Sequence, residues 1–455
     1  MNREDEIARR KTLVADRETD LERWSQRESL LPEWSRRAAL AGQMVPAFAR
    51  VLDIGCGAMD IERALPDGCA YQPCDLVRRD DRTIVCDLNR GEFPTGVQAD
   101  VVVLLGVLEY VTEPLDLLRK VRSLGCPLVC SYSITDRRPQ LDRPAQGWIN
   151  NLDFRALNEL MRQAGFRLQC RQQVDPLQDL FKWVPEDSSR SRPPVTRSVA
   201  ILSYFNDTNF GDRLGFHVIN SLLPVDAVVT HASTRPWTMP DEPFDLLILG
   251  IGNSLNAPAV ARPELKRLVE RTPHTIGIFG TQYREQYLRG QTPGQMASLL
   301  DRLTTWWARY EEDLLAFGRG RRNARHLGDF LISAFPLTKP AMDRTLVIPA
   351  EIRSQDLSLD RVIQQIQAYR RVKTARLHTM LCALTSAEQV CYQEQREVEG
   401  EGASGKFRSQ LYDVFGRTYD EDKFFDVDRD AVARYKLLVE ANMIDLRSEI
   451  ARLLD

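Results

Sequence analysis

The stretch Val51-Leu52-Asp53-Ile54-Gly55-Cys56-Gly57 decides the fold of the first part of this sequence. Residues 50–54 are largely apolar and have the length of a buried strand, and two glycines follow within three residues. A glycine turn after the first strand of an open α/β sheet lets a ligand approach the backbone closely, and such sheets bind ligands at that end. The stretch therefore predicts an α/β domain with a ligand site at the carboxyl end of its first strand.

Short apolar segments alternate with helical patterns along the whole chain, an arrangement typical of parallel sheets covered by helices. The expected strands are 50–54, 70–74, 100–105, 127–132, 166–172, 198–203, 227–230, 246–250, 275–279, 345–348 and 389–392. Residues 185–194 contain no apolar side chain that could anchor a core, so this segment reads as a linker. We therefore expect two α/β domains, residues 1–184 and 198–455, joined by a linker at 185–197. One or two amphipathic helices within the first 40 residues should pack on the first domain.

The composition is that of a soluble globular protein, with 455 residues, 43% hydrophobic and 27% charged. The net charge of −3 provides no positive field to hold a nucleic acid. The longest apolar run, 101–108, is too short to span a membrane, and the charged N-terminus does not resemble a signal peptide, so we expect a cytoplasmic protein. The nine cysteines form no C-x-x-C pair, which indicates reduced, partly buried thiols and no metal site. No oligomeric state is indicated.

The run 51–57 resembles the first motif of class I S-adenosylmethionine-dependent methyltransferases, and further features follow in the order that this family has. Asp75 matches the acid that hydrogen-bonds the ribose hydroxyls, Asp87-Leu88 looks like the pair beside the adenine, and Ala164-Gly165-Phe166 matches the turn into the late strands. The resemblance covers roughly residues 45–172 and implies a Rossmann-like domain. It also implies that S-adenosylmethionine is bound by Asp53, Gly55, Gly57, Asp75, Asp87, Leu88 and Gly106. The alternative is a Rossmann-like domain without this cofactor.

The base for methyl transfer is not a histidine in this region, because no histidine precedes His217. Acidic and phenolic side chains follow the strand ends on the cofactor side, where a general base could lie. The candidates are Glu109, Tyr110, Tyr132 and Asp136, and we take Glu109 and Tyr110 as the catalytic pair. Each of these residues could instead belong to the rim or cap a helix.

A second candidate site lies in the second half, where Arg376-Leu377-His378 precedes an apolar helix. An arginine and a histidine at a helix start can bind an anion through the helix dipole and the guanidinium fork, while the histidine gives or takes a proton. A packed or capping histidine is the alternative.

This second half resembles the polysaccharide pyruvyl transferase family, whose domain folds like the two-lobed GT-B glycosyltransferases. The Arg-Leu-His triplet is the most recognisable segment, and shorter matches surround Asn209, Arg309 and Asp329 over about 198–418. The resemblance implies phosphoenolpyruvate as co-substrate, with Arg309, Arg376 and His378 as catalytic residues. It implies donor binding by Asn209, Gly211, Asp212, Ser254 and Lys406.

Together these patterns predict a bifunctional enzyme that methylates and pyruvylates the same surface polysaccharide or its lipid- or nucleotide-linked precursor. Trp307 and Tyr310 stand where the pyruvyl transferase family has Ser and Asp around Arg309, which keeps two alternatives open. One is a methyltransferase that carries a non-catalytic glycan-binding module. The other is a methyltransferase fused to a GT-B glycosyltransferase that uses a nucleotide sugar.

Overall fold

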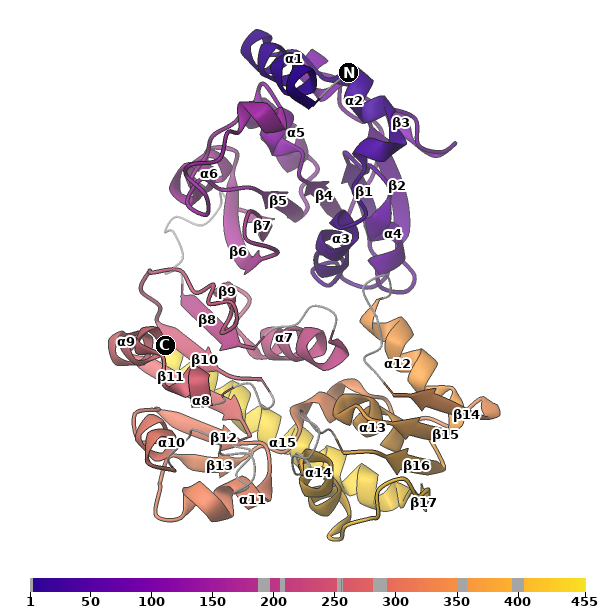
Figure 1. Cartoon of the computed structure of the whole chain (residues 1–455), viewed down its shortest axis with the longest axis vertical. Coiled ribbons are helices and arrows are strands. Elements are labelled where there is room, and N and C mark those ends of the chain that lie inside the picture. The colour runs from indigo at the N-terminus through magenta and orange to yellow at the C-terminus, as the bar shows by residue number, and fades with distance from the viewer. Residues whose placement is uncertain are drawn as a thin grey trace. The chain divides into compact units, whose positions relative to one another are not determined.

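The computed structural model describes residues 3–186, 197–204, 209–251, 255, 257–280, 293–349, 358–394 and 405–455. The chain divides into two compact units. The first contains the described residues up to Glu186 together with Ser358, and the second contains the others. Both units are α/β, and their elements are labelled in Figure 1.

The first unit is built on one sheet with the strand order β6-β7-β5-β4-β1-β2-β3. Its strands are β1 (Arg50–Ile54), β2 (Ala70–Asp75), β3 (Ile84–Val85), β4 (Val101–Leu105), β5 (Leu128–Tyr132), β6 (Phe166–Gln173) and β7 (Asp179–Pro185). The strands β1 to β5 run parallel to one another. The strand β7 is antiparallel to both of its neighbours, β5 and β6. Every residue of β4 is buried, as expected for a parallel strand that is covered on both faces.

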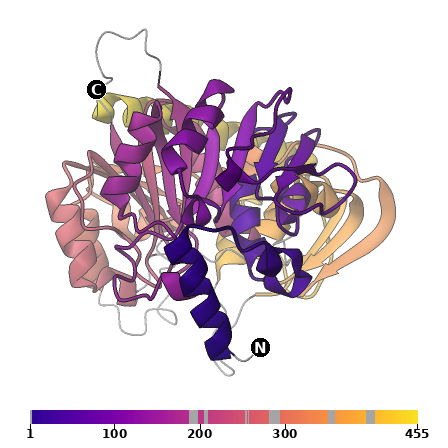
Figure 2. The same cartoon turned by 90° about the horizontal axis from the view of Figure 1, so that it is seen from above.

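Helices and short 3₁₀ turns connect these strands. The α-helices of the first unit are α1 (Arg3–Asp16), α2 (Leu21–Ser25), α3 (Trp34–Gly42), α4 (Asp60–Ala64), α5 (Pro114–Ser123) and α6 (Phe154–Gln163). The 3₁₀ turns are η1 (Arg27–Ser29), η2 (Leu88–Arg90), η3 (Leu108–Tyr110) and η4 (Pro144–Gln146). The helix α1 is the indigo ribbon beside the N mark in Figure 2. No helix among the residues that the structure describes is long and apolar enough to cross a bilayer.

The second unit contains a parallel sheet with the order β13-β12-β11-β10-β8-β9. Its strands are β8 (Ser198–Ser203), β9 (Val228–Ser233), β10 (Leu246–Leu249), β11 (His274–Phe279), β12 (Thr305–Ala308) and β13 (Ala324–His326). The associated helices are α7 (Phe210–Leu222), α8 (Ala257–Val260), α9 (Pro263–Arg271), α10 (Pro293–Leu300), α11 (Glu311–Asp313), the π-helical η5 (Leu314–Gly318) and the 3₁₀ helix η6 (Phe330–Ala334). Buried aromatic and aliphatic side chains such as Phe279 and Trp306 form the core of this sheet.

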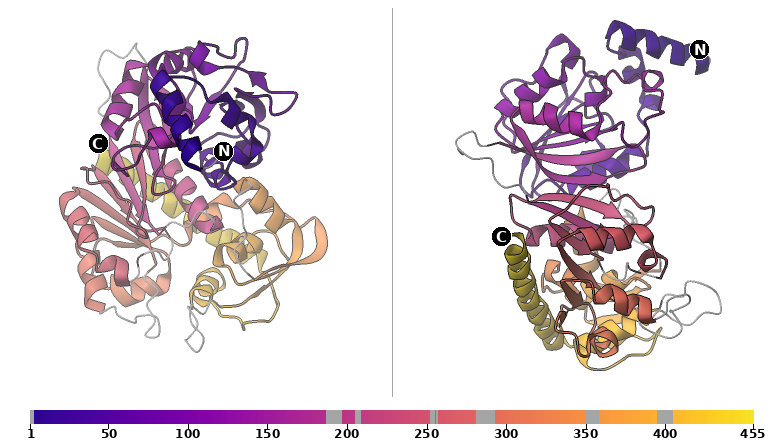
Figure 3. Two further views of the ribbon diagram at one scale, coloured as in Figure 1. Left: turned by 45° about the horizontal axis from the view of Figure 1, so that its top comes forward. Right: turned by 90° about the vertical axis from the view of Figure 1, so that its left-hand side faces the viewer.

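A smaller sheet of the second unit has the order β14-β15-β16-β17, of which only the last pairing is antiparallel. Its elements are β14 (Met342–Ile348), α12 (Leu359–Gln367), β15 (Tyr369–Thr374), α13 (Leu377–Leu384), β16 (Gln389–Tyr392), α14 (Lys406–Phe415) and β17 (Phe425–Asp426). The long C-terminal helix α15 (Arg429–Leu454) runs along the unit from the smaller sheet to the larger one, as Figures 1 and 3 show. The unit thus has two α/β lobes, and their GT-B-like character stays a prediction.

All eleven strands expected from the sequence are present, with ends shifted by a few residues. Six further strands among the described residues do not follow from the apolar pattern: β3, β7, β12, β13, β15 and β17. Most are short or carry charged and aromatic side chains that hide the apolar pattern. Pro185, which the expected linker included, is the last residue of β7, and residues 187–196 of that linker lie outside the described ranges. All nine cysteines are free and eight are buried, in agreement with the expected reduced thiols.

A buried carboxylate fixes the antiparallel part of the first sheet. Asp179, at the start of β7, is fully buried and pairs in register with Tyr132 of β5. Its carboxylate accepts hydrogen bonds from Arg171 of β6 at 2.9 Å and from Arg137 at 3.0 Å. A buried carboxylate in such contacts is costly to remove, because the arginine beside it would be left uncompensated.

We expect Asp179→Ala to lower the free energy of unfolding of the first unit by about 3–5 kcal/mol. The matched control is Asp116→Ala, because Asp116 pairs with Lys120 on the surface of α5 and is 61% exposed. That change should cost less than about 1 kcal/mol. Urea titrations followed by far-ultraviolet circular dichroism give both numbers, and equal effects of the two substitutions would contradict the importance of the Asp179 pair.

Candidate functional site

A pocket of about 260 Å³ lies in the first unit, at the carboxyl ends of the parallel strands. Its floor comes from the residues that follow β1, β2, β3 and β4, and its other walls come from the N-terminal helices and the turn between β6 and β7. This is the end of an open α/β sheet at which ligands bind. The volume lies just below the range of about 300–1,000 Å³ that is typical of small-molecule sites.

The structure brings all nine residues that the sequence analysis selected in this half to the same pocket. They are Asp53, Gly55, Gly57, Asp75, Asp87, Leu88, Gly106, Glu109 and Tyr110. The two other base candidates lie elsewhere. Tyr132 is buried and its hydroxyl donates to the Asn150 carbonyl, and Asp136 is exposed and accepts from the Phe154 backbone at the start of α6. Neither lines the pocket, whereas Glu109 and Tyr110 do.

Two glycines shape the floor of the pocket. Gly55, directly after β1, has a φ of +74°, and a Cβ there would lie 2.3 Å from the side chain of Val107. Gly106, directly after β4, has a φ of +67°, and a Cβ there would lie 2.5 Å from the guanidinium of Arg37. A side chain is excluded at both positions by conformation and by space. The strand ends therefore carry no side chains of their own, and the space above them is taken by Val107 and Arg37.

Asp75 closes β2 with its carboxylate in the pocket. One oxygen, Oδ2, accepts from the Gly57 backbone at 2.8 Å, and the other, Oδ1, accepts from Arg79 Nη2 at 3.1 Å and from the Val77 backbone at 3.1 Å. The bond to Gly57 links the second strand end to the glycine turn after β1. The Cys56 thiol is a further, weak donor to Oδ2 at 3.8 Å, so the three stronger bonds leave about one of the four lone pairs of the carboxylate for a ligand.

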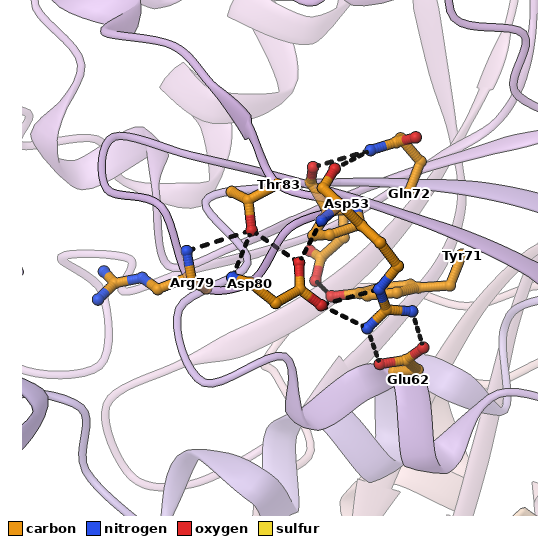
Figure 4. A network of polar contacts seen from close by, with 9 residues as sticks. Asp53, Glu62, Tyr71, Gln72, Arg79, Asp80 and Thr83 are labelled. Carbon is orange, nitrogen blue, oxygen red and sulfur yellow. Dashed lines mark hydrogen bonds and ion pairs between the residues drawn. The ribbon is translucent and has the colours of Figure 1, made fainter.

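The loop after Asp75 is held by a polar network, much of which Figure 4 shows. Thr83 Oγ1 accepts from the backbone of Arg79 and of Asp80, and Arg82 donates to both Asp80 and Glu62 of α4. The Arg82 pairs are partly exposed and contribute little one by one, but together they tie the loop to α4. The loop thereby holds Arg79 beside Asp75.

Asp53 lies at the centre of the sheet, where β1 pairs with both β2 and β4. It is 3% exposed and accepts a hydrogen bond of 2.7 Å from the Tyr71 hydroxyl, a contact visible in Figure 4. Burial raises the pKa of Asp53 from its usual 3.8 to about 7, against the opposing effect of Tyr71. The charged form of this carboxyl group is therefore strongly disfavoured by its surroundings.

Glu109, on η3 after β4, is a buried acid of the pocket whose two carboxylate oxygens have different surroundings. It is 1% exposed, and its Oε1 accepts from the Ser133 backbone at 2.8 Å, whereas its Oε2 has no hydrogen-bond partner. Burial raises its pKa, which makes the carboxylate a better proton acceptor. Next to it, the Tyr110 hydroxyl accepts from Trp148 Nε1 at 2.9 Å, and burial raises the pKa of Tyr110 as well.

Asp87 and Leu88 lie at the far end of the pocket, after β3. The Asp87 carboxylate caps η2 by accepting from the Asn89 backbone at 3.0 Å. It also accepts from the Thr19 hydroxyl at 3.3 Å, so the N-terminal segment reaches the same end of the pocket.

The sequence analysis expected the N-terminal helices to pack on this unit, but it missed that they line the site. The residues they contribute are Thr19, Trp24, Leu30, Trp34, Arg37 and Ala38. Trp24 packs edge-on against Tyr110, with ring centroids 5.1 Å apart. The amphipathic pattern of this segment indicated packing, and the two tryptophans were the only local signal of a closer role.

In the second unit, Arg309, Asp329 and His378 form a compact cluster. Arg309 Nη2 contacts the Asp329 carboxylate and lies 2.8 Å from His378 Nε2, while Asp329 lies 4.0 Å from that nitrogen. Because a guanidinium only donates, His378 Nε2 acts as the acceptor. Burial and the neighbouring Arg309 lower the pKa of His378, so the ring is neutral at pH 7. This geometry makes His378 Nε2 a hydrogen-bond acceptor, whereas the sequence left open whether the ring gives or takes a proton.

Most of the other residues selected in this half lie at the starts of helices. Gly211 packs directly under the His378 ring, since a Cβ there would lie 1.7 Å from Nδ1, and Asn209 caps α7 by accepting from the Gly211 and Asp212 backbones. Lys406, the first residue of α14, is close enough to lower the pKa of His378. Arg376 is the N-cap residue of α13, at the helix start expected from the sequence. Ser254 lies outside the described residues.

Comparisons with known proteins found no family model and no curated protein that matches this sequence. Solved structures match over its N-terminal third. CalO1, a methyltransferase of calicheamicin biosynthesis in its SAH-bound form, is 19% identical with a TM-score of 0.28, and the match covers 33% of this chain and 54% of CalO1. A putative O-methyltransferase from Nostoc punctiforme is 18% identical with a TM-score of 0.30, over 35% of this chain and 59% of the other.

A possible histamine N-methyltransferase from Thermotoga maritima is 13% identical, with a TM-score of 0.27, over 33% of this chain and 92% of the other. This chain spans about half the length of CalO1. These similarities are partial.

The buried Asp53 predicts a dependence of stability on pH. Its folded-state pKa of about 7 exceeds the usual 3.8, so the folded unit binds a proton more tightly than the unfolded chain does. The resulting stabilisation is complete below about pH 4 and is lost as the pH rises through about 7. Asp53→Asn keeps an acceptor for Tyr71 but cannot ionise. We expect melting temperatures of the wild type to fall more between pH 5 and pH 7.5 than those of the variant, with exposed Asp81→Asn as control. Parallel curves for Asp53→Asn and the wild type would exclude the shifted carboxyl.

Proposed function

We propose that the first unit is an S-adenosylmethionine-dependent methyltransferase. One observation carries the proposal: bare glycine turns after β1 and β4, the Asp75 carboxylate after β2 and the Asp87-Leu88 pair after β3 line one continuous pocket. These features follow the strand order β3-β2-β1-β4. Along this direction the pocket presents first the Asp87-Leu88 pair, then the Asp75 carboxylate, which can accept from hydroxyl groups, and then the two glycine turns. An adenosyl group followed by an amino-acid chain matches this sequence of chemistries.

The residues divide into two roles around that cofactor, which supplies an electrophilic methyl group when bound. Asp75 has about one lone pair left for a ribose hydroxyl, and the glycines after β1 and β4 place no side chain of their own beside the chain beyond it. Glu109 presents a carboxylate oxygen without a hydrogen-bond partner to the same pocket. We propose that this oxygen accepts the proton of the hydroxyl or amino group that is methylated, with Tyr110 orienting that group.

Asp75→Ala should weaken the binding of S-adenosylhomocysteine by about 1.5–3 kcal/mol, which is typical for hydrogen bonds to a charged group. Isothermal titration calorimetry on the full chain measures this change. Asp81→Ala is the matched control, because Asp81 is an exposed acid in the same loop and does not line the pocket. Its affinity should equal that of the wild type. Unchanged affinity in folded Asp75→Ala would remove Asp75 from the cofactor site.

We propose for the second unit an anionic-donor site around Arg309, His378, Arg376 and Lys406. The supporting observation is the convergence of Arg309 and Lys406 on a neutral imidazole. The positive charges of Arg309 and Lys406 beside this imidazole would suit a donor that bears a phosphate and a carboxylate, such as phosphoenolpyruvate. The acceptor we propose for both units is a carbohydrate or its lipid- or nucleotide-linked precursor, so that pyruvyl and methyl groups are added to one glycan.

If this assignment is correct, phosphoenolpyruvate binds to the wild-type chain, and Arg376→Lys weakens binding about tenfold because a lysine loses the bidentate fork. Arg371→Lys, an exposed position on the preceding strand β15, serves as control. Calorimetry with phosphoenolpyruvate and with nucleotide sugars separates the possibilities. Binding of a nucleotide sugar alone supports a glycosyltransferase, and binding of neither supports a glycan-binding module.

A further inference from the structure

Arg37 of α3 is a charged residue of the methyltransferase pocket that neither the motifs nor the proposed transfer step accounts for. Its guanidinium lies over Gly106, where Nη1 would be 2.5 Å from a Cβ. Nη1 donates to the amide oxygen of Gln178 at 3.1 Å, which is a neutral acceptor, and Nε is buried without a hydrogen-bond partner. The side chain also lies across Trp34, 5.3 Å from the ring centroid. Arg37 is therefore held firmly and retains a donor for a ligand.

The charge of Arg37 is only partly compensated by its surroundings. Glu109, Asp175 and Asp53 all favour its charged form, yet loss of hydration outweighs them and the pKa of Arg37 is lowered. Two of these acids, Glu109 and Asp53, have raised pKa values themselves, so burial also disfavours their charged forms. The positive charge of Arg37 is therefore not fully balanced by the carboxyl groups around it, and the carboxylate of a ligand could balance it further.

The strand order indicates which part of the cofactor reaches this guanidinium. The residues proposed for the adenine follow β3, and the acid proposed for the ribose ends β2. Continuing in the same direction, the next strands are β1 and β4, which end at Gly55 and Gly106. The amino-acid half of S-adenosylmethionine is attached to the ribose, so it extends toward these two ends. Arg37 covers the second of them.

We propose that Arg37 binds the α-carboxylate of the methionine half of S-adenosylmethionine and is a specificity-determining residue for that end of the cofactor. This inference rests on the proposed methyltransferase function. A guanidinium can hold a carboxylate by two parallel N–H···O bonds, and only Nη1 of Arg37 is bonded to the described part of the protein, which leaves Nη2 and the buried Nε for such a pair. Because Arg37 belongs to α3, its bond to the cofactor would also fasten the N-terminal helices to the strand ends.

The test compares S-adenosylmethionine with decarboxylated S-adenosylmethionine, which lacks only the carboxylate. We expect the wild-type chain to prefer the carboxylated form by about tenfold or more, the usual strength of a charge-assisted pair. In Arg37→Gln this preference should disappear, while the affinity for the decarboxylated form stays within about twofold of wild type. Arg37→Lys should retain part of the preference, since it keeps the charge without the fork. Isothermal titration on the full chain measures all affinities.

Arg36→Gln is the matched control, because Arg36 precedes Arg37 on the same helix and does not line the pocket. A full preference that persists in Arg37→Gln overturns the inference. If Arg37→Gln does not fold, full preference in folded Arg37→Lys overturns it equally. If neither form of the cofactor binds the wild type, the proposed methyltransferase function fails. If the wild type binds both forms with equal affinity, only the role of Arg37 fails.

Discussion

The parallel pairing of β1 with β2 on one side and β4 on the other is the constraint on which the pocket depends. It aligns Asp53 with Val103 and Pro73, and so brings the ends of the three strands to one edge of the sheet. The Gly57 backbone donates to Asp75 across this edge at 2.8 Å. Without the shared register, the glycine turn and the carboxylate would not face the same space, and neither would be a ligand site alone.

Burial of polar groups at this edge has an energetic cost that the sheet itself must offset. Asp53 and Glu109 are both almost completely buried, and both have raised pKa values because their charged forms have lost hydration. Residues with such shifts concentrate at functional sites, although structural networks produce them as well. Here each carboxyl group lines one pocket that also holds Arg37, which supports a binding role over a purely structural one.

Much of the site was predictable because its residues lie next to strand ends, where a local pattern reports position. The glycines at 55 and 57, Asp75, and Glu109 each follow a strand that the apolar pattern identifies. Arg37 and Trp34 were not predictable in this way. They come from a charged N-terminal segment, and their position over the pocket results from packing between residues far apart in the sequence, such as Arg37 with Gln178. Similarly, the short strand β12 was missed because Trp306 and Trp307 did not resemble a strand of the core.

The central claim, that the first unit binds S-adenosylmethionine along its strand ends, is tested most directly by hydrogen–deuterium exchange of the full chain with and without S-adenosylhomocysteine. The account predicts slower exchange in the segments after β1, β2, β3 and β4, and in the N-terminal residues 19–38 that line the same pocket. Unchanged exchange in all of these segments at saturating ligand, or protection confined to residues beyond 197, would contradict it.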